Sequence, residues 1–260
     1  MIAAKTDASF AGRAGEHEKN NPVVIEPERQ LPVVGHYDVL VAGGGIAGVA
    51  AAVAAARRGA SVCLLEKTFS LGGLATIGNV IVYLPLCDGM GRKVMSGLSE
   101  ELIKLSVSNL TADYPPARFR RIPEAWLEPE GDIEARKRRR YIAEFNPAFF
   151  ILALEELVVN LGIKVLYDTR ACAVCRVEDK ITHIIVENKS GRQAISCGAV
   201  VDATGDADIC FLAGEETESL DANVLCGWFY TYQAGVPDGL KLHCLTNKYN
   251  KYGGKENAVG

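Results

Sequence analysis

Three glycines and one acidic residue have the types and the spacing of a dinucleotide-binding turn. Gly43, Gly45 and Gly48 follow the pattern G-x-G-x-x-G, and Glu66 follows near the ~20-residue offset expected for such a site. In this pattern the first glycine permits a sharp turn, the second lets a pyrophosphate approach the backbone, and the third lets a helix pack closely on a strand. The acid accepts hydrogen bonds from ribose hydroxyls. The alternative is a structural glycine turn in an ordinary strand–helix unit.

Two predicted strands flank this turn. Residues 38–42 form a short apolar run without a helical period, which is typical of a parallel strand covered on both faces. Residues 61–65 form a similar run that ends at Glu66. An acid at this strand end repels a 2′-phosphate, so the expected ligand is of the FAD or NAD type rather than NADP. The strand–helix–strand unit alone does not choose between FAD and NAD.

The helix between the two strands would position the phosphates. Residues 46–58 consist mostly of alanine and valine, which predicts a buried, close-packed helix with Gly59 at its C-terminal cap. Ile46 and Ala47 begin this helix. Unpaired N–H groups and the positive end of the helix dipole would face the phosphates there.

Composition limits the class of partner. The chain has 260 residues, 48% of them hydrophobic and 23% charged, as in a globular protein with a sizeable core. A net charge of −4 gives no general attraction to nucleic acid or to an anionic membrane, so we expect a small-molecule substrate. The sequence shows neither a signal peptide nor a run of about 18 apolar residues, which predicts a cytoplasmic protein. Its eight cysteines are expected to be reduced.

The segments around this unit have weaker patterns. Residues 1–34 predict a mobile arm without chemistry. Gly72 and Gly73 form a second glycine pair, which suits backbone that passes close to a flat ligand or its phosphates. The alternative for this pair is a turn before a strand at 80–84.

Two further helices and a charged segment precede the next strands. One helix is predicted to begin at Ser96 as its N-cap, and another at Asn146 with Gly162 as its C-terminal cap. Between them, residues 109–145 are rich in Pro, Arg, Glu and Asp, and the basic run 136–140 predicts a solvated excursion.

Short strands joined by hairpin turns follow from residue 163 to residue 201, which predicts a β-meander. Cys172 and Cys175 lie three positions apart in one of these strands. They would face opposite sides, so we expect them to pack rather than to form a redox pair or hold a metal. No metal site is predicted. The expected fold is α/β, a Rossmann-like parallel sheet with a β-meander insertion.

The last of these strands runs into the segment DATGDAD, which begins at Asp202. Together with the fingerprint AGGGIAG, the pair Glu66-Lys67, the segments GGLAT and SGLSEEL and the meander, it makes residues 31–214 resemble the FAD-dependent oxidoreductases with a glutathione-reductase-type flavin domain. Nicotinamide dehydrogenases continue with further βαβ units instead. The resemblance implies FAD as the cofactor.

The resemblance also implies roles for single positions. The first glycines would hold the FAD pyrophosphate, Glu66 the adenosine ribose, and the second glycine pair the pyrophosphate and ribityl chain. A backbone group at or near Ala171 would contact adenine, and the segment after Asp202 would close the cofactor from the other side. The implied cofactor-binding residues are Gly43, Gly45, Ile46, Ala47, Gly48, Glu66, Lys67, Gly72, Gly73, Ala75, Thr76, Ala171, Ala203, Thr204, Gly205 and Asp206.

The expected domain organisation follows from this resemblance. After an arm at 1–34, residues 35–214 would form the FAD-binding domain with an inserted segment at about 80–145. Residues 215–260 would begin a substrate domain, with one strand at 224–234 and a polar tail from Leu240. Members of this group continue further, so we expect an incomplete substrate domain, with a missing C-terminal segment or a partner subunit supplying the rest.

Two functional hypotheses remain at this point. The first is an FAD-dependent oxidoreductase acting on a small organic substrate. The second is a non-catalytic FAD- or NAD-binding module or subunit. No catalytic residue can be assigned from the sequence, and Cys87 and Asp88 are candidates only by their position beyond the second glycine pair.

Overall fold

The computed structural model describes residues 22, 24–108, 122–128, 131–218, 224–235, 240–248 and 257–259. The chain divides into two compact units, Met1–Glu215 and Glu216–Gly260. Most of the predicted arm at 1–34 lies outside the described residues, and residues 24–32 contain neither helix nor strand. The strands of the first unit are β1 (Val33–Ala42), β2 (Val62–Leu65), β3 (Val82–Tyr83), β4 (Ala143–Glu144), β5 (Lys164–Leu166), β6 (Arg170–Val177), β7 (Lys180–Asn188) and β8 (Gly191–Asp202). Its helices are α1 (Ile46–Ala56), α2 (Leu98–Val107), α3 (Ile133–Arg138), α4 (Pro147–Asn160) and α5 (Asp208–Leu212), with 3-10 turns at Gly73–Ala75 and Glu124–Trp126.

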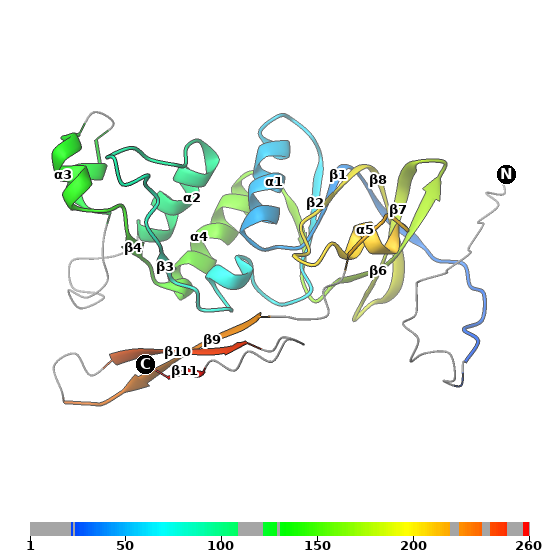
Figure 1. Ribbon diagram of the computed structural model, residues 1–260. Helices are drawn as coiled ribbons and strands as arrows, with labels where there is room; N and C mark the ends of the chain where they lie inside the picture. The colour runs from blue at the N-terminus through cyan, green and yellow to red at the C-terminus, as the bar shows by residue number, and fades with distance from the viewer. Residues whose placement is uncertain are drawn as a thin grey trace. The chain divides into compact units, whose positions relative to one another are not determined.

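A six-stranded sheet in the order β5-β2-β1-β8-β7-β6 forms the centre of the first unit (Figure 1). β1 runs parallel to β2 and β8, and β2 runs parallel to β5, whereas β7 pairs antiparallel with both β6 and β8. This arrangement confirms the predicted α/β fold with a parallel sheet and a meander. It also places the carboxyl ends of β5, β2, β1 and β8 at one edge of the sheet, which is where α/β sheets bind ligands.

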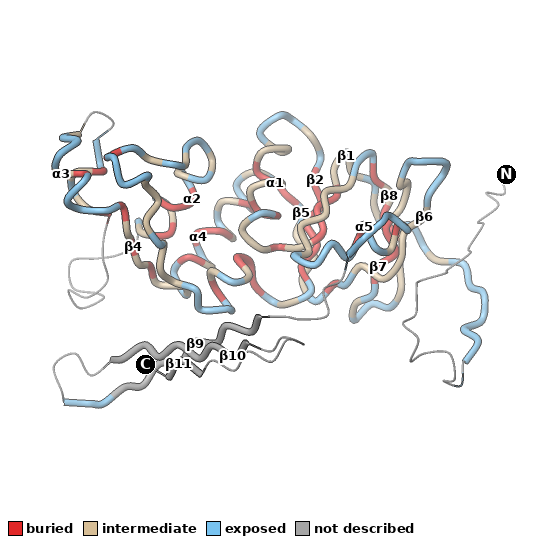
Figure 2. Tube along the Cα trace, viewed as in Figure 1, coloured by how far each residue is buried: buried red, intermediate tan, exposed pale blue. Residues whose placement is uncertain are grey.

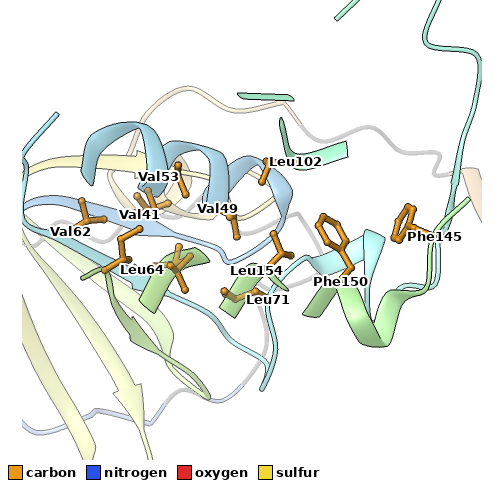
Figure 3. Packing of buried hydrophobic residues seen from close by; sticks show 13 residues of the cluster. Val41, Val49, Val53, Val62, Leu64, Leu71, Leu102, Phe145, Phe150 and Leu154 are labelled. Carbon is orange, nitrogen blue, oxygen red and sulfur yellow. The ribbon is translucent and has the colours of Figure 1, made fainter. Parts of the chain in front are cut away.

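Alternate residues of the central strands pack on opposite faces of the sheet, as expected for strands covered on both sides. Val41 and Leu64 face α1 and α4, where they join a core that includes Leu71 and Leu154 (Figure 3). Their neighbours in sequence pack on the other face, against α5 and the meander. Figure 2 shows buried residues along β1, β2 and the inner sides of α1 and α4.

The caps of α1 and α4 confirm the predicted ends of these helices. Asn146 Oδ1 accepts a hydrogen bond of 2.9 Å from the N–H of Ala148, and Pro147 occupies the first turn of α4. Gly59 and Gly162, just beyond α1 and α4, have φ angles of +84° and +68°. Both angles lie in the left-handed region that favours glycine after a helix.

Three predicted local features differ in the structure. α2 begins after Gly97 rather than at a Ser96 cap, and the Ser96 carbonyl accepts a hydrogen bond from the Ser99 hydroxyl instead. The strand predicted at 80–84 is only the two-residue β3. The two final meander strands are one 12-residue strand, β8. A Cβ on Gly198 would lie 2.9 Å from the Asp38 carbonyl oxygen, so this glycine allows β1 to approach rather than ending a strand.

Part of the inserted segment is packed rather than solvated, which corrects the prediction from its charge. Trp126 and Tyr141 are 2% and 1% exposed, and their rings stack with centroids 5.4 Å apart. The guanidinium of Arg136 lies 5.0 Å from the centre of the Trp126 ring. The rest of the basic run, residues 137–140, is exposed. Part of the predicted excursion, residues 109–121, lies outside the described residues.

The second unit contains a three-stranded antiparallel sheet in the order β11-β10-β9. Its strands are β9 (Val224–Tyr232), β10 (Leu240–Lys248) and β11 (Asn257–Val259). The predicted polar tail from Leu240 is therefore wrong, because β10 pairs with β9 along its whole length. Within the described ranges, no helix has the length and apolar character needed to cross a membrane.

Candidate functional site

The first glycine turn lies where the carboxyl ends of three strands meet. The N–H of Gly43 donates to the Leu65 carbonyl at the end of β2, at 2.8 Å, and the N–H of Ala203 donates to the Ala42 carbonyl, also at 2.8 Å. Gly43 has a φ of +107°, and a Cβ at this position would overlap the carbonyl oxygen of Ala203. Only glycine therefore fits the turn between β1 and α1.

Gly45 and Gly48 have opposite surroundings. A Cβ on Gly48 would overlap the carbonyl oxygen of Gly43, so this glycine lets α1 pack against the end of β1. A Cβ on Gly45 would meet no atom within 4 Å. Gly45 is the N-cap of α1 and has no side-chain cap, and it forms an isolated parallel bridge with Gly72. The N–H groups of the first helical turn have no partner within the helix. The open space at Gly45 is the place where an anion can approach the helix dipole.

Glu66 joins the ends of two strands through its carboxylate. The side chain is 6% exposed. Its Oε2 accepts a hydrogen bond from the N–H of Gly44 at 2.7 Å, and its Oε1 accepts from both the N–H and the hydroxyl of Thr68, each at 2.7 Å. Glu66 therefore fixes the glycine turn from within the protein. A carboxylate oxygen can accept a second hydrogen bond, so Oε2 still has capacity for a ribose hydroxyl.

The second glycine pair packs directly on the first glycine turn. The N–H of Gly72 donates to the Gly44 carbonyl at 2.8 Å, and a Cβ on Gly73 would lie 3.2 Å from Gly45 Cα. The pair therefore does more than form a turn before a strand, because its backbone lies directly beside Gly45 and borders the open space there. Ala75 is partly buried in the same loop.

Thr76 does not present its hydroxyl to this opening. The residue is 2% exposed, and its hydroxyl donates to the Leu71 carbonyl at 2.6 Å. Its side chain therefore stabilises the loop, and any contact of Thr76 with a ligand would involve its backbone.

The DATGD segment forms the turn after β8. Asp202 Oδ1 accepts hydrogen bonds from the N–H and the hydroxyl of Thr204, and Oδ2 accepts from the N–H groups of Ile209 and Cys210 in α5. Burial by itself would raise the pKa of Asp202, but the hydrogen bonds from Thr204 and Cys210 outweigh it and lower the pKa. Ala203 is thereby fixed beside Gly43, whereas Gly205 and Asp206 are exposed.

Lys67 and residues next to Ala171 border one surface pocket. The pocket has a volume of about 420 Å³, and its lining includes Lys67, Asp168, Arg170, Cys172 and Glu187. The end of β2 and the first meander strand thus border the same pocket. Ala171 itself pairs with Val186, and the register shifts between Ala171 and Ala173, so Cys172 lies at a bulge.

The two position-based catalytic candidates lie in the inserted segment. Asp88 accepts hydrogen bonds from the N–H groups of Met90 and Arg92, at 2.7 and 3.0 Å, and so forms an exposed turn. The hydrogen bond from Arg92 lowers the pKa of Asp88, which keeps it ionised. Cys87 forms an isolated bridge with Lys93 and packs against the buried cluster that contains Trp126 and Tyr141. Neither residue is placed by the structure as an acid or nucleophile.

Several residues that shape the site were not predicted. Gly44, Thr68 and Asp202 make the hydrogen bonds that hold the turns together. Ser70 is buried in the loop before the second glycine pair. An acid followed two residues later by Thr is a recognisable local hydrogen-bonding pattern, so the spacing of Glu66 and Thr68 could have predicted their contact. Among the described residues, no three His, Cys, Asp or Glu side chains gather where they could hold a metal ion.

Comparison with known proteins gives one family match and two partial sequence matches. The model of the FAD dependent oxidoreductase family matches residues 38–223. A thioredoxin reductase of Ureaplasma parvum is 39% identical over 72 residues, which cover 28% of this chain and 23% of that protein. A 3-oxo-5-alpha-steroid 4-dehydrogenase of Comamonas testosteroni is 35% identical over 100 residues, covering 36% and 19% of the two chains. The matches thus span less than a quarter of each relative's length.

Two solved structures share the fold. The L-proline dehydrogenase from P. horikoshii has a TM-score of 0.51 and 18% identity, and the match covers 84% of this chain and 68% of that one. A geranylgeranyl bacteriochlorophyll reductase-like protein from Thermoplasma acidophilum has a TM-score of 0.50 and 18% identity, with coverage of 83% and 54%. At these identities the similarity concerns the fold alone.

Proposed function

Because the chain belongs to the FAD-dependent oxidoreductase family, we propose that it supplies the FAD-binding part of an enzyme that oxidises a small organic substrate. FAD is the cofactor of this family. Within the family, the meander and the DATGD segment support a flavin domain of the glutathione-reductase type. The substrate is expected to be a small molecule rather than nucleic acid or a membrane.

The opening at Gly45 is the observation that carries this proposal. A Cβ on Gly45 would meet nothing within 4 Å, although the neighbouring Gly43 and Gly48 leave no space for a side chain. Steric demands of the protein therefore do not explain the glycine, whereas the close approach of a pyrophosphate does. The first-turn N–H groups of α1 would bind its oxygens, and the backbone of Gly72 and Gly73 would line its other side.

The other predicted residues have complementary roles in this proposal. Glu66 would accept a hydrogen bond from the adenosine ribose on Oε2 while keeping its bond to Gly44. Lys67 and the backbone at Ala171 would border the adenine, and the segment from Ala203 to Asp206 would lie beside the cofactor at the end of β8. Bound FAD would supply the redox chemistry by accepting a hydride equivalent. The described residues bind it, orient it and exclude water from its phosphates.

A titration of the purified chain tests the proposal. FAD should bind more tightly than NAD, as measured by calorimetry with each dinucleotide. Equal affinity for both, or no binding of FAD, would refute the FAD assignment.

A second experiment separates an enzyme from a non-catalytic module. Bound flavin should bleach under anaerobic conditions when small-molecule reductants such as amino acids, 2-hydroxy acids or steroids are added. A flavin that dithionite reduces but that none of these compounds reduces would favour a non-catalytic FAD-binding subunit.

A further inference from the structure

A buried serine between Glu66 and the second glycine pair has a hydroxyl without a partner. Ser70 is 5% exposed, and no described residue forms a hydrogen bond with its Oγ. Buried hydroxyls in folded proteins nearly always have a partner, because an unsatisfied one loses its hydrogen bonds to water. The Oγ of Ser70 therefore calls for a partner from outside the described chain.

The loop around Ser70 is fixed on both sides. Before it, the N–H of Asp168 donates to the Thr68 carbonyl at 2.9 Å, and the Thr68 hydroxyl lies 3.3 Å from the Ser70 carbonyl oxygen. After it, Leu71 is fully buried in the core beside Leu154 (Figure 3). The loop is thus anchored at Thr68 and at Leu71, on either side of Ser70.

The same loop lies against the predicted phosphate site. Glu66 accepts a hydrogen bond from the N–H of Gly44, and Gly72 donates one to the carbonyl of Gly44. The segment from Glu66 to Gly72 is thus attached at both ends to the first glycine turn. Ser70 lies within this closed loop, between the acid expected at the ribose and the glycines expected at the pyrophosphate.

We propose that the Ser70 hydroxyl hydrogen-bonds to the adenosine diphosphate half of FAD, at a phosphate oxygen or a ribose hydroxyl. This inference rests on the proposed function and adds a residue to it. A hydroxyl is suited to this role because it both donates to a phosphate oxygen and accepts from a sugar hydroxyl. The alternative partner is an internal water molecule, which would be present with or without the cofactor.

Ser70→Ala distinguishes these two partners, with Ser106→Ala as a matched control. Ser106 is also buried, at 2% exposure, but its hydroxyl donates to the Ile103 carbonyl at 2.7 Å and accepts from the Tyr83 hydroxyl at 3.0 Å. Calorimetric titration with FAD and with ADP, and thermal unfolding without ligand, should be measured for both variants and the unsubstituted chain. Ser70→Cys, which keeps the size of the side chain, serves if the alanine variant does not fold.

We expect Ser70→Ala to weaken binding of FAD and of ADP by a similar factor, roughly fivefold to tenfold, without lowering the melting temperature of the ligand-free chain. Ser106→Ala should lower that melting temperature and leave both affinities unchanged. Loss of stability in Ser70→Ala with unchanged affinities would identify an internal water and overturn the inference. Weaker binding of FAD but not of ADP would overturn the assignment to the adenosine diphosphate half. Failure of the unsubstituted chain to bind FAD would instead refute the proposed function.

Discussion

The carboxylate of Glu66 lies 2.7 Å from the backbone nitrogen of Gly44 and accepts its hydrogen bond. This contact joins the acid at the end of β2 to the middle of the glycine turn that follows β1. The same carboxylate accepts two hydrogen bonds from Thr68. Glu66 is therefore part of the scaffold that shapes the phosphate site, in addition to its expected contact with the ribose.

The first prediction concerns this double role. Glu66→Ala should lower the free energy of unfolding of the ligand-free chain by about 1 to 3 kcal/mol, because it leaves the Gly44 N–H without its acceptor. Glu66→Gln should be nearly as harmful, since both carboxylate oxygens accept from N–H donors and an amide nitrogen accepts none. Urea unfolding followed by circular dichroism measures both effects.

The control for Glu66 is Glu156→Gln, on the exposed side of α4. It should change the stability by less than about 0.5 kcal/mol. If Glu66→Ala weakened FAD binding but left the ligand-free stability unchanged, the contact with Gly44 would contribute nothing to folding and Glu66 would be only a ribose ligand.

The second prediction contrasts two glycines of one turn. Gly45→Ala should leave the stability of the ligand-free chain within about 0.5 kcal/mol, because its Cβ enters open space, and should weaken FAD binding strongly. Gly48→Ala should destabilise the fold by about 3 kcal/mol or more, because its Cβ would overlap the carbonyl oxygen of Gly43. Thermal unfolding and FAD titration of each variant give the comparison. Tight FAD binding by Gly45→Ala would show that the open space beside Gly45 does not hold the cofactor.

The glycine turn was predictable because its requirements are local. The sharp turn at Gly43 and the close packing at Gly48 follow from the size of the missing side chains and from the flanking strand and helix. The hydrogen bond that Glu66 accepts from the Gly44 N–H was not predictable in the same way. Its contact with Gly44 depends on how β1 and β2 align in the sheet, which the spacing of the two residues does not specify.

Two other differences have a similar origin. The charge of the basic run predicted solvation, but Arg136 packs on the ring of Trp126, a contact formed only after the segment folds back on itself. The role of Asp202 was not predicted either: its carboxylate caps α5 through the N–H groups of Ile209 and Cys210. This cap spans more residues than a standard N-cap, so capping patterns do not reveal it.

The third prediction uses the pKa of Asp202, which is lower in the folded chain than its usual value of 3.8. A carboxyl with a lowered pKa stabilises the fold at pH values above its unfolded-state pKa, and this stabilisation is lost as the pH falls through the folded-state pKa. Asp202→Asn should therefore reduce the free energy of unfolding by about 1 to 2 kcal/mol at pH 7, because the amide cannot accept on both sides.

The difference between Asp202→Asn and the unsubstituted chain should shrink as the pH is lowered from 5 to below 3.8, the region in which the carboxyl becomes protonated. Chemical unfolding at a series of pH values measures it. Asp179→Asn is the control, since its side chain is fully exposed in the turn between β6 and β7. A difference that stayed constant down to pH 2 would show that the charge of Asp202 does not stabilise the turn.

The last prediction concerns the inserted segment and its independence from the cofactor site. Arg136 is 7% exposed, lies over the Trp126 ring, and donates through Nε to the Ala125 carbonyl at 2.8 Å. Arg136→Ala should cost about 2 kcal/mol or more, and Arg136→Lys should not restore the loss, because an ammonium lacks the planar fork that stacks and bonds at once. Hydrogen exchange should show faster opening of residues 122–145. Because these contacts lie within the insert, FAD affinity should change less than about twofold.

Arg138→Ala, on an exposed position of the same helix, should have little effect on either measurement. A large loss of FAD affinity in Arg136→Ala alone would show that the insert and the glycine turns fold as one cooperative unit.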